Sequence, residues 1–151
     1  LHLSIRRQRQ MCIRDRIVGT RGETGEFFEN AYEFIAGLDV TQLHVFSYSE
    51  RPGTQALKIE HVVTPDEKHK RSQRLLTLSD EKTRSFYVRH TGQVMPVLME
   101  KTKAGLPMHG FTTNYIRVEV ENDPSLDNKV VNVLLGELNE EGTALKGTIL
   151  S

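Results

Sequence analysis

The sequence contains very little cysteine. Cys12 is the single cysteine among 151 residues, which excludes an intrachain disulfide framework. It also excludes an iron–sulfur cluster or another metal site that is built on several thiolates of this chain. The histidines show no pairing at the spacing of about two to four residues that is typical of metal ligands. We therefore expect no metal site within this chain.

Long apolar runs and a net charge are lacking as well. No stretch approaches the ~20 apolar residues of a membrane helix, so we expect no membrane partner. Twenty basic side chains balance twenty acidic ones, but residues 64–103 hold nine basic and five acidic groups. This basic block can face a polyanion such as a nucleic acid, or it can be an ordinary solvated helix face.

The first sixteen residues do not read as the start of a domain. They hold five arginines and one aspartate without lasting periodicity. A basic arm that binds nucleic acid is one interpretation. The string from Ile5 to Arg16 resembles a translated sequencing adapter, and we adopt that interpretation. Residues 1–16 are therefore set apart from the fold as a non-family basic tail, and Cys12 has no predicted role.

Residues 17–48 predict a strand, a helix and a second strand. Ile17-Val18-Gly19 indicates the end of a buried strand, and Thr24 is the expected cap of a helix over 25–36. The second strand runs through 42–48. Two strands joined by a helix over so few residues indicate a parallel βαβ unit.

Both strands end in polar loops. Arg51-Pro52-Gly53 forces a turn directly after the second strand. Since ligands in parallel α/β sheets bind at the carboxyl ends of strands, this loop and the loop after Gly19 are expected to form one rim. An ordinary strand exit is the alternative, and the spacing alone favours it.

Residues 64–90 predict one long helix. Thr64-Pro65-Asp66-Glu67 is typical of a helix start, with Thr64 as the cap and Glu67 completing a capping box. Gly92 follows the expected end near His90. A helix of this length is expected to connect two domains.

After Gly92 the apolar pattern changes to a period of two. Five short strands are expected near 93–100, 107–111, 114–121, 129–135 and 145–150, with turn signals that include Gly136. Five such strands predict a small antiparallel barrel of OB-like type. Asn114, Tyr115 and Arg117 combine an aromatic ring and a cation that can meet RNA. Equally, Tyr115 can be a packed barrel residue and Arg117 a solvated neighbour.

Several ordered strings resemble one protein family. They are Tyr48-Ser49-Glu50-Arg51-Pro52-Gly53-Thr54-Gln55-Ala56 and Gly110-Phe111-Thr112-Thr113-Asn114-Tyr115-Ile116. Together with Ile17-Val18-Gly19 and Gly22-Glu23-Thr24 they closely resemble the radical S-adenosylmethionine tRNA methylthiotransferases over residues 17–151. The string His44-Val45-Phe46 is most similar to the branch that acts on N6-threonylcarbamoyladenosine at tRNA position 37. Thr20-Arg21 stands where many members of this family have Phe-Pro.

The resemblance implies a fold that is α/β plus all-β. Residues 17–90 would be the last two βα units of a partial (β/α) radical-SAM barrel with a long connecting helix, and residues 91–151 a TRAM domain, an OB-like RNA-binding barrel. The implied enzyme is a cytoplasmic, monomeric transferase with S-adenosylmethionine and two 4Fe-4S clusters. It adds a methylthio group to C2 of the modified adenine in the anticodon stem-loop of tRNA.

The resemblance and the loops together suggest two sets of site residues. The S-adenosylmethionine pocket would be lined by Val18, Gly19, Thr20, Phe46, Tyr48, Ser49, Arg51, Pro52 and Gly53. Arg51 can pair with the cofactor's carboxylate or with a structural one such as Glu23, and the structural pair is slightly favoured. RNA would meet Lys101, Lys103, Thr113, Asn114, Tyr115 and Arg117.

The cysteine sets that hold the clusters in this family are absent from this chain, so we predict that the chain alone has no methylthiotransferase activity. A stand-alone RNA-binding module is the alternative function. A structural remnant without activity is a third possibility, because two βα units expose the edges of their sheet.

Overall fold

The computed structural model describes residues 12–150, which divide into two compact units. The first, which we call the strand–helix unit, comprises Cys12–Thr83. The second, which we call the barrel unit, begins at Arg84 and includes the remaining described residues. Helix α2 (Pro65–Val88) contributes to both. The predicted division into a domain over residues 17–90 and a second domain over residues 91–151 stays a prediction.

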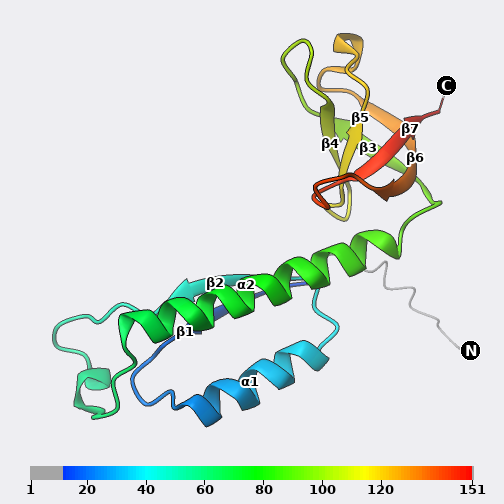
Figure 1. The fold of residues 1–151 in the computed structure, drawn as a ribbon. Helices are drawn as coiled ribbons and strands as arrows, with labels where there is room; N and C mark the ends of the chain where they lie inside the picture. Colours follow the sequence, from blue (N-terminus) through cyan, green and yellow to red (C-terminus); the bar gives the residue numbers. More distant parts are fainter. Residues whose placement is uncertain (1–11, 151) are drawn as a thin grey trace, which may run out of the picture. The chain divides into compact units, whose positions relative to one another are not determined.

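The strand–helix unit contains the predicted parallel pair (Figure 1). Strand β1 (Ile13–Val18) is followed by helix α1 (Gly25–Gly37), strand β2 (Gln42–Ser47) and the short 3-10 helix η1 (Gln55–Lys58). The parallel register joins Val18 to Ser47. As predicted, Thr24 caps α1, accepting a hydrogen bond from the Phe27 amide at 3.2 Å.

Strand β1 begins earlier than the sequence indicated. Residues 13–16, set apart as part of the tail, pair with the first residues of β2. The Cys12 carbonyl accepts a hydrogen bond from the Thr41 amide at 2.9 Å, so Cys12 does have a structural role. The strand is hidden in the sequence because three consecutive residues of β1, Arg14 to Arg16, are charged and break any apolar alternation. Its partner strand also lies about 30 residues further on. The rest of the predicted tail, residues 1–11, lies outside the described residues.

One small core joins both helices to the sheet. It contains Val18, Phe28, Val40, Leu43, Leu75 and Leu78. The Ser79 hydroxyl of α2 accepts a hydrogen bond from the Leu43 amide at 2.9 Å and donates to the Leu43 carbonyl at 3.2 Å. The Ser79 hydroxyl therefore satisfies the backbone groups of Leu43 that a third strand would otherwise pair with.

Thr64 caps helix α2 as predicted, since its hydroxyl accepts from the Glu67 amide at 3.2 Å. The Glu67 carboxylate instead accepts from Arg71 Nε at 3.0 Å. The predicted capping box is thus only half formed. A cation one turn along the helix offers this carboxylate a charged partner, which binds it more strongly than the neutral Thr64 amide would.

The barrel unit is a closed five-stranded barrel with strand order β3-β4-β5-β7-β6 (Figure 1). Its strands are β3 (Val94–Met99), β4 (Met108–Thr112), β5 (Arg117–Val120), β6 (Val130–Leu138) and β7 (Leu145–Ile149), with the 3-10 helix η2 (Pro124–Leu126) before β6. The interior holds Phe86, Val97, Met99, Met108, Ile116, Val118, Val133, Leu135 and Leu145. The end of α2 therefore belongs to the barrel's core.

Two details of the predicted barrel are wrong. The pairing is mixed rather than antiparallel. After β5, the chain places β6 beside β3. Strand β7 then pairs antiparallel with β6 and parallel with β5. Gly136 is not a turn: β6 continues through it, with a register shift between Leu135 and Leu138. A Cβ at Gly136 would lie 2.9 Å from the Lys146 carbonyl oxygen, so close approach of β7 is what requires glycine there.

Candidate functional site

The loops after β1 and β2 leave the sheet side by side. The Tyr48 amide donates to the Val18 carbonyl at 2.8 Å, which holds the two strand exits together. A pocket of about 390 Å³ opens beside the β2 exit and is lined by Ile17, Phe46, Ser47, Tyr48, Ser49, Arg51, Thr54 and Ala56. We call it the rim pocket. Its floor is apolar and its border carries hydroxyl groups and a guanidinium.

Four of the nine predicted cofactor residues line the rim pocket: Phe46, Tyr48, Ser49 and Arg51. The other five do not. Val18 is fully buried in the core, and the Pro52-Gly53 turn lies between the lining residues Arg51 and Thr54 without lining the pocket itself. Ile17 was not predicted, although the register places it directly beside Phe46, and both side chains are about half exposed. The cofactor assignment itself stays a prediction.

A buried carboxylate organises the base of this rim. Glu23 is 7% exposed and accepts from the Gly19 amide at 2.7 Å, from Arg16 Nη2 at 2.8 Å and from Arg71 Nη1 at 3.1 Å. The same Arg71 nitrogen donates to the Glu23 carbonyl at 2.8 Å. These contacts tie β1, the loop after it and α2 to one carboxylate.

The predicted pairing of Arg51 with Glu23 is wrong. Glu23 is occupied by Arg16 and Arg71, which reach it from β1 and from the inner side of α2. Arg51 follows β2 in an exposed loop, and its guanidinium makes no hydrogen bond or ion pair with residues 12–150. It therefore borders the rim pocket with its donors available.

Lys68 fills the space beside Gly19. A Cβ at Gly19 would overlap the Lys68 side chain at Cγ, and Gly19 has a φ of +76°. Lys68 Nζ donates to the Tyr48 carbonyl at 3.3 Å and lies 5.5 Å from the centre of the Tyr48 ring. Glycine is thus required at position 19 for both its conformation and its small size, and Lys68 supports the Tyr48 side of the rim.

Arg21 is a contact residue that the sequence did not predict. Its Nε donates to Glu50 at 2.7 Å, and its Nη1 donates to the carbonyls of Leu57 at 2.9 Å and Ile59 at 3.1 Å. The hydrogen bond raises the pKa of Arg21 and lowers the pKa of Glu50. One feature of the sequence could have pointed to this residue: Thr20-Arg21 stands where many members of the similar family have Phe-Pro. Arg21 links the loop after β1 to the loop after β2.

The predicted RNA residues fall into two groups at opposite ends of β4 (Figure 1). Lys101 and Lys103 lie in the loop before β4, whereas the 113–116 turn follows it. A strand of five residues separates the groups by roughly 13 Å along its axis. The structure therefore does not bring the six predicted residues into one cluster.

The 113–116 turn presents an aromatic ring to solvent. Tyr115 is 66% exposed, so the alternative of a packed barrel residue is wrong. Its φ is +61°, a left-handed conformation that costs an L-residue roughly 1–2 kcal/mol. Strained conformations of this kind are concentrated at functional sites. Arg117, partly exposed, opens the next strand.

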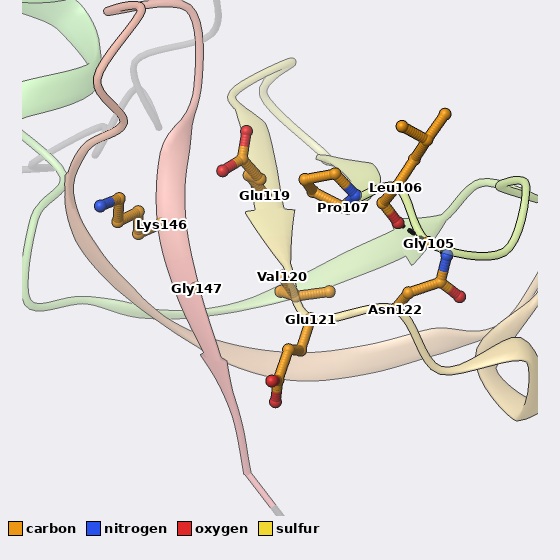
Figure 2. Close-up of a pocket in the computed structure, with 9 residues that line it drawn as sticks. All are labelled: Gly105, Leu106, Pro107, Glu119, Val120, Glu121, Asn122, Lys146 and Gly147. Atoms are coloured by element: carbon orange, nitrogen blue, oxygen red, sulfur yellow. Dashed lines mark hydrogen bonds between the residues drawn. The ribbon is translucent and has the colours of Figure 1, made fainter.

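A second pocket, of about 600 Å³, lies on the barrel unit and was not predicted (Figure 2). Its lining includes Glu119 and Glu121, with Lys146 on the neighbouring strand. Glu119 is already engaged, because Asn139 Nδ2 donates to it at 2.8 Å and His109 Nε2 lies 3.2 Å away. Two carboxylates repel phosphate, so this pocket is a poor candidate for a nucleic-acid interface.

Within residues 12–150 we find no group of three or more His, Cys, Asp or Glu side chains arranged to hold a metal ion. Across the same residues, no helix is both long and apolar enough for a membrane span.

Comparison with known proteins gives a consistent set of relatives. The threonylcarbamoyladenosine tRNA methylthiotransferase MtaB of Bacillus subtilis is 34% identical over 123 residues, 79% of this chain and 27% of that protein. The tRNA-2-methylthio-N(6)-dimethylallyladenosine synthase of Aliarcobacter butzleri is 32% identical over 142 residues, 91% of this chain and 31% of that protein. The MtaB protein of Aquifex aeolicus is 31% identical over 80% of this chain and 28% of its own length. No family model matches. The chain spans about three-tenths of the length of these relatives.

Proposed function

We propose that this chain, which is homologous to the tRNA methylthiotransferases over most of its length, is the C-terminal part of a radical S-adenosylmethionine enzyme. The enzyme would add a methylthio group to C2 of N6-threonylcarbamoyladenosine at position 37 of tRNA. The observation that carries this proposal is the 34% identity to the B. subtilis MtaB protein over 79% of the chain. In this proposal residues 17–90 close the radical-SAM barrel and residues 91–151 form an OB-like TRAM domain that holds the anticodon stem-loop.

The rim pocket fits part of S-adenosylmethionine. Ile17, Phe46 and Tyr48 offer an apolar and aromatic surface for an adenine ring, and Ser49 and Thr54 offer hydroxyls. The guanidinium of Arg51, which has no hydrogen-bond or ion-pair partner among residues 12–150, has the charge and the geometry to bind a carboxylate. When bound, the cofactor would supply a radical that activates the adenine. The side chains of the rim pocket would bind and orient it.

The chain's residues do not fit a 4Fe-4S cluster. Such a cluster needs several thiolates, and Cys12 is the single cysteine. We therefore assign no catalytic residue to this chain and derive no step through a cluster. Any methylthio transfer would require cysteines from outside residues 1–151, so the chain by itself is expected to be inactive.

Relatives of two kinds leave the branch to be decided by experiment. The B. subtilis relative is named for threonylcarbamoyladenosine and the A. butzleri relative for dimethylallyladenosine. His44-Val45-Phe46 supports the first branch by its resemblance. Binding of stem-loops that carry one or the other modified adenosine would distinguish them, and we expect the threonylcarbamoyl form to bind more tightly.

The proposal is tested by measuring both ligands on the same chain. S-adenosylmethionine binding is measured by equilibrium dialysis and tRNA binding by filter binding, for the wild type, Phe46→Ala and the control Phe27→Ala. Phe27 is exposed on α1 and lies outside the rim pocket. We expect Phe46→Ala to weaken cofactor binding about tenfold while tRNA binding is unchanged.

The alternative function, a stand-alone RNA-binding module, predicts a different result. It is favoured by the exposed aromatic at Tyr115, which offers a surface on which a base can stack. In that case tRNA binds and S-adenosylmethionine does not. A chain that binds neither ligand would contradict both functions.

A further inference from the structure

The turn that carries Tyr115 is joined to the end of α2 by a continuous chain of hydrogen bonds. His90 Nδ1 lies 2.8 Å from the Phe86 carbonyl, and His90 Nε2 lies 3.3 Å from Asn114 Nδ2. The Thr112 hydroxyl donates to Asn114 Oδ1 at 2.6 Å and accepts from the Ile116 amide at 2.9 Å. Both ends of the 113–116 turn are thereby fixed. We call His90, Thr112 and Asn114 the turn relay.

Donors and acceptors match at every step of the turn relay. Because the Phe86 carbonyl can only accept, His90 Nδ1 carries the hydrogen and Nε2 is left as the acceptor for the Asn114 amide. The Asn114 oxygen then faces the Thr112 hydroxyl, whose own oxygen receives the Ile116 amide. A single tautomer of His90 and a single orientation of the Asn114 amide satisfy all these contacts.

Both ends of the turn relay contact the core of the barrel unit. Thr112 is 4% exposed. At the other end the partly buried His90 ring meets the fully buried Phe86 ring edge-on, with 4.7 Å between the ring centres. The Tyr115 amide also donates to the Thr112 carbonyl at 3.0 Å, which closes the turn.

We infer that His90 and Thr112 are positioning residues that hold Tyr115 in its left-handed conformation so that its ring can stack on an unpaired base of RNA. This inference rests on the proposed RNA-binding role of the barrel unit. It places the contact surface at the end of the barrel that carries His90, Asn114 and Tyr115, rather than at the loop with Lys101 and Lys103. Arg117, at the start of β5, would supply a cation beside the stacked base.

The test compares variants of the whole chain that keep or remove one hydrogen-bonding group. Thr112→Val keeps the shape of the side chain but removes the hydroxyl, and Thr112→Ser restores the hydroxyl. His90→Gln keeps an acceptor toward Asn114. Binding of a fluorescein-labelled RNA stem-loop with unpaired adenosines is measured by anisotropy. The backbone amide of Tyr115 and the side-chain amide of Asn114 are followed by NMR.

We expect Tyr115→Ala to weaken RNA binding about tenfold, and Thr112→Val to weaken it several-fold with shifted Tyr115 and Ile116 amides. Thr112→Ser should restore both properties. Because Gln keeps an acceptor toward Asn114, His90→Gln should leave the Asn114 side-chain amide close to its wild-type position.

Two outcomes would overturn the inference while leaving the proposed function intact. One is tight RNA binding by Thr112→Val with a displaced turn; the other is binding that does not change on Tyr115→Ala. If the amides respond as expected but the wild type binds no RNA, the turn relay is real and the proposed RNA-binding role fails instead.

Discussion

The two units of this chain are stabilised in different ways. In the barrel unit five strands close on themselves around an apolar interior that includes Met108, Ile116 and Val118, each fully buried. In the strand–helix unit two strands leave the outer edge of β1 without a strand partner among residues 12–150. The interior of that unit contains the charged pair of Glu23 and Arg71.

This difference affects both the stability of each unit and the surface that each unit leaves open to a ligand. A closed barrel buries its sheet edges and one whole face, so hydrophobic burial can hold it together. The two-stranded sheet exposes one face, on which Ile17 and Phe46 pair side by side and line the rim pocket. In the strand–helix unit, the exposed sheet face itself therefore offers an apolar surface to a ligand.

The largest expected effect is in the barrel. Phe86→Ala removes a fully buried ring from its core, and we expect the free energy of unfolding of the barrel unit to fall by about 3–5 kcal/mol. Denaturant unfolding, with hydrogen exchange to assign the transition to residues 84–150, measures this loss. The matched control is Val88→Ala, which changes a half-exposed residue of the same helix. A loss confined to residues 12–83 would show that Phe86 does not stabilise the barrel.

A smaller effect is expected from the buried ion pair. Glu23→Gln leaves Arg71 buried without its full countercharge and weakens the hydrogen bonds from Arg16 and Gly19. We expect the strand–helix unit to lose about 2–3 kcal/mol. Glu29→Gln removes the exposed pair with Arg74 and should change little. Hydrogen exchange in residues 12–83 reports the difference, and equal losses in the two variants would mean that burial of Glu23 does not matter.

Local sequence patterns predicted the elements of this fold well. Both helices, their capping residues Thr24 and Thr64, and five barrel strands follow from periodicity and turn residues, and relatives confirm the resemblance to tRNA methylthiotransferases. What failed depends on pairing with another strand. Residues 13–16 form a strand because β2, about 30 residues further on, pairs with them, and Gly136 lies inside β6 because the next strand, β7, packs against it.

The candidate site was predicted in part for the same reason. Phe46, Tyr48, Ser49 and Arg51 are neighbours in sequence and line one pocket, so a local motif could find them. The charged partners of Glu23 come from β1 and α2. The partners of Arg21 lie 29 to 38 residues further along the chain. Lys101 and Lys103 are close to Asn114 in sequence, but a strand separates them in the barrel.

The smallest effect concerns alkaline pH and sharpens the contrast between the units. Burial raises the pKa of the Tyr87 phenol in the barrel core, against a weaker opposing effect of the Arg117 backbone. Because the folded pKa lies above the unfolded one, its contribution to stability is complete below the ordinary tyrosine pKa of about 10. It is lost as the pH rises through the folded value. Ionisation of the phenol thus favours the unfolded barrel. The Glu50–Arg21 pair acts in the opposite pH range, because the pKa of Glu50 is lowered. It stabilises the strand–helix unit above the ordinary carboxyl pKa, and this contribution is lost as the pH falls.

We therefore expect Tyr87→Phe to flatten the loss of barrel stability above about pH 10, while costing about 1 kcal/mol at neutral pH through the lost hydroxyl contact. Denaturant midpoints measured between neutral and alkaline pH give the slope for each variant. Tyr32→Phe, a change in the strand–helix unit, is the matched control and should leave the barrel's alkaline slope as it is in the wild type. If Tyr87→Phe keeps the wild-type slope, another group titrates with barrel unfolding, and the closed core owes its alkaline limit to a residue other than its buried phenol.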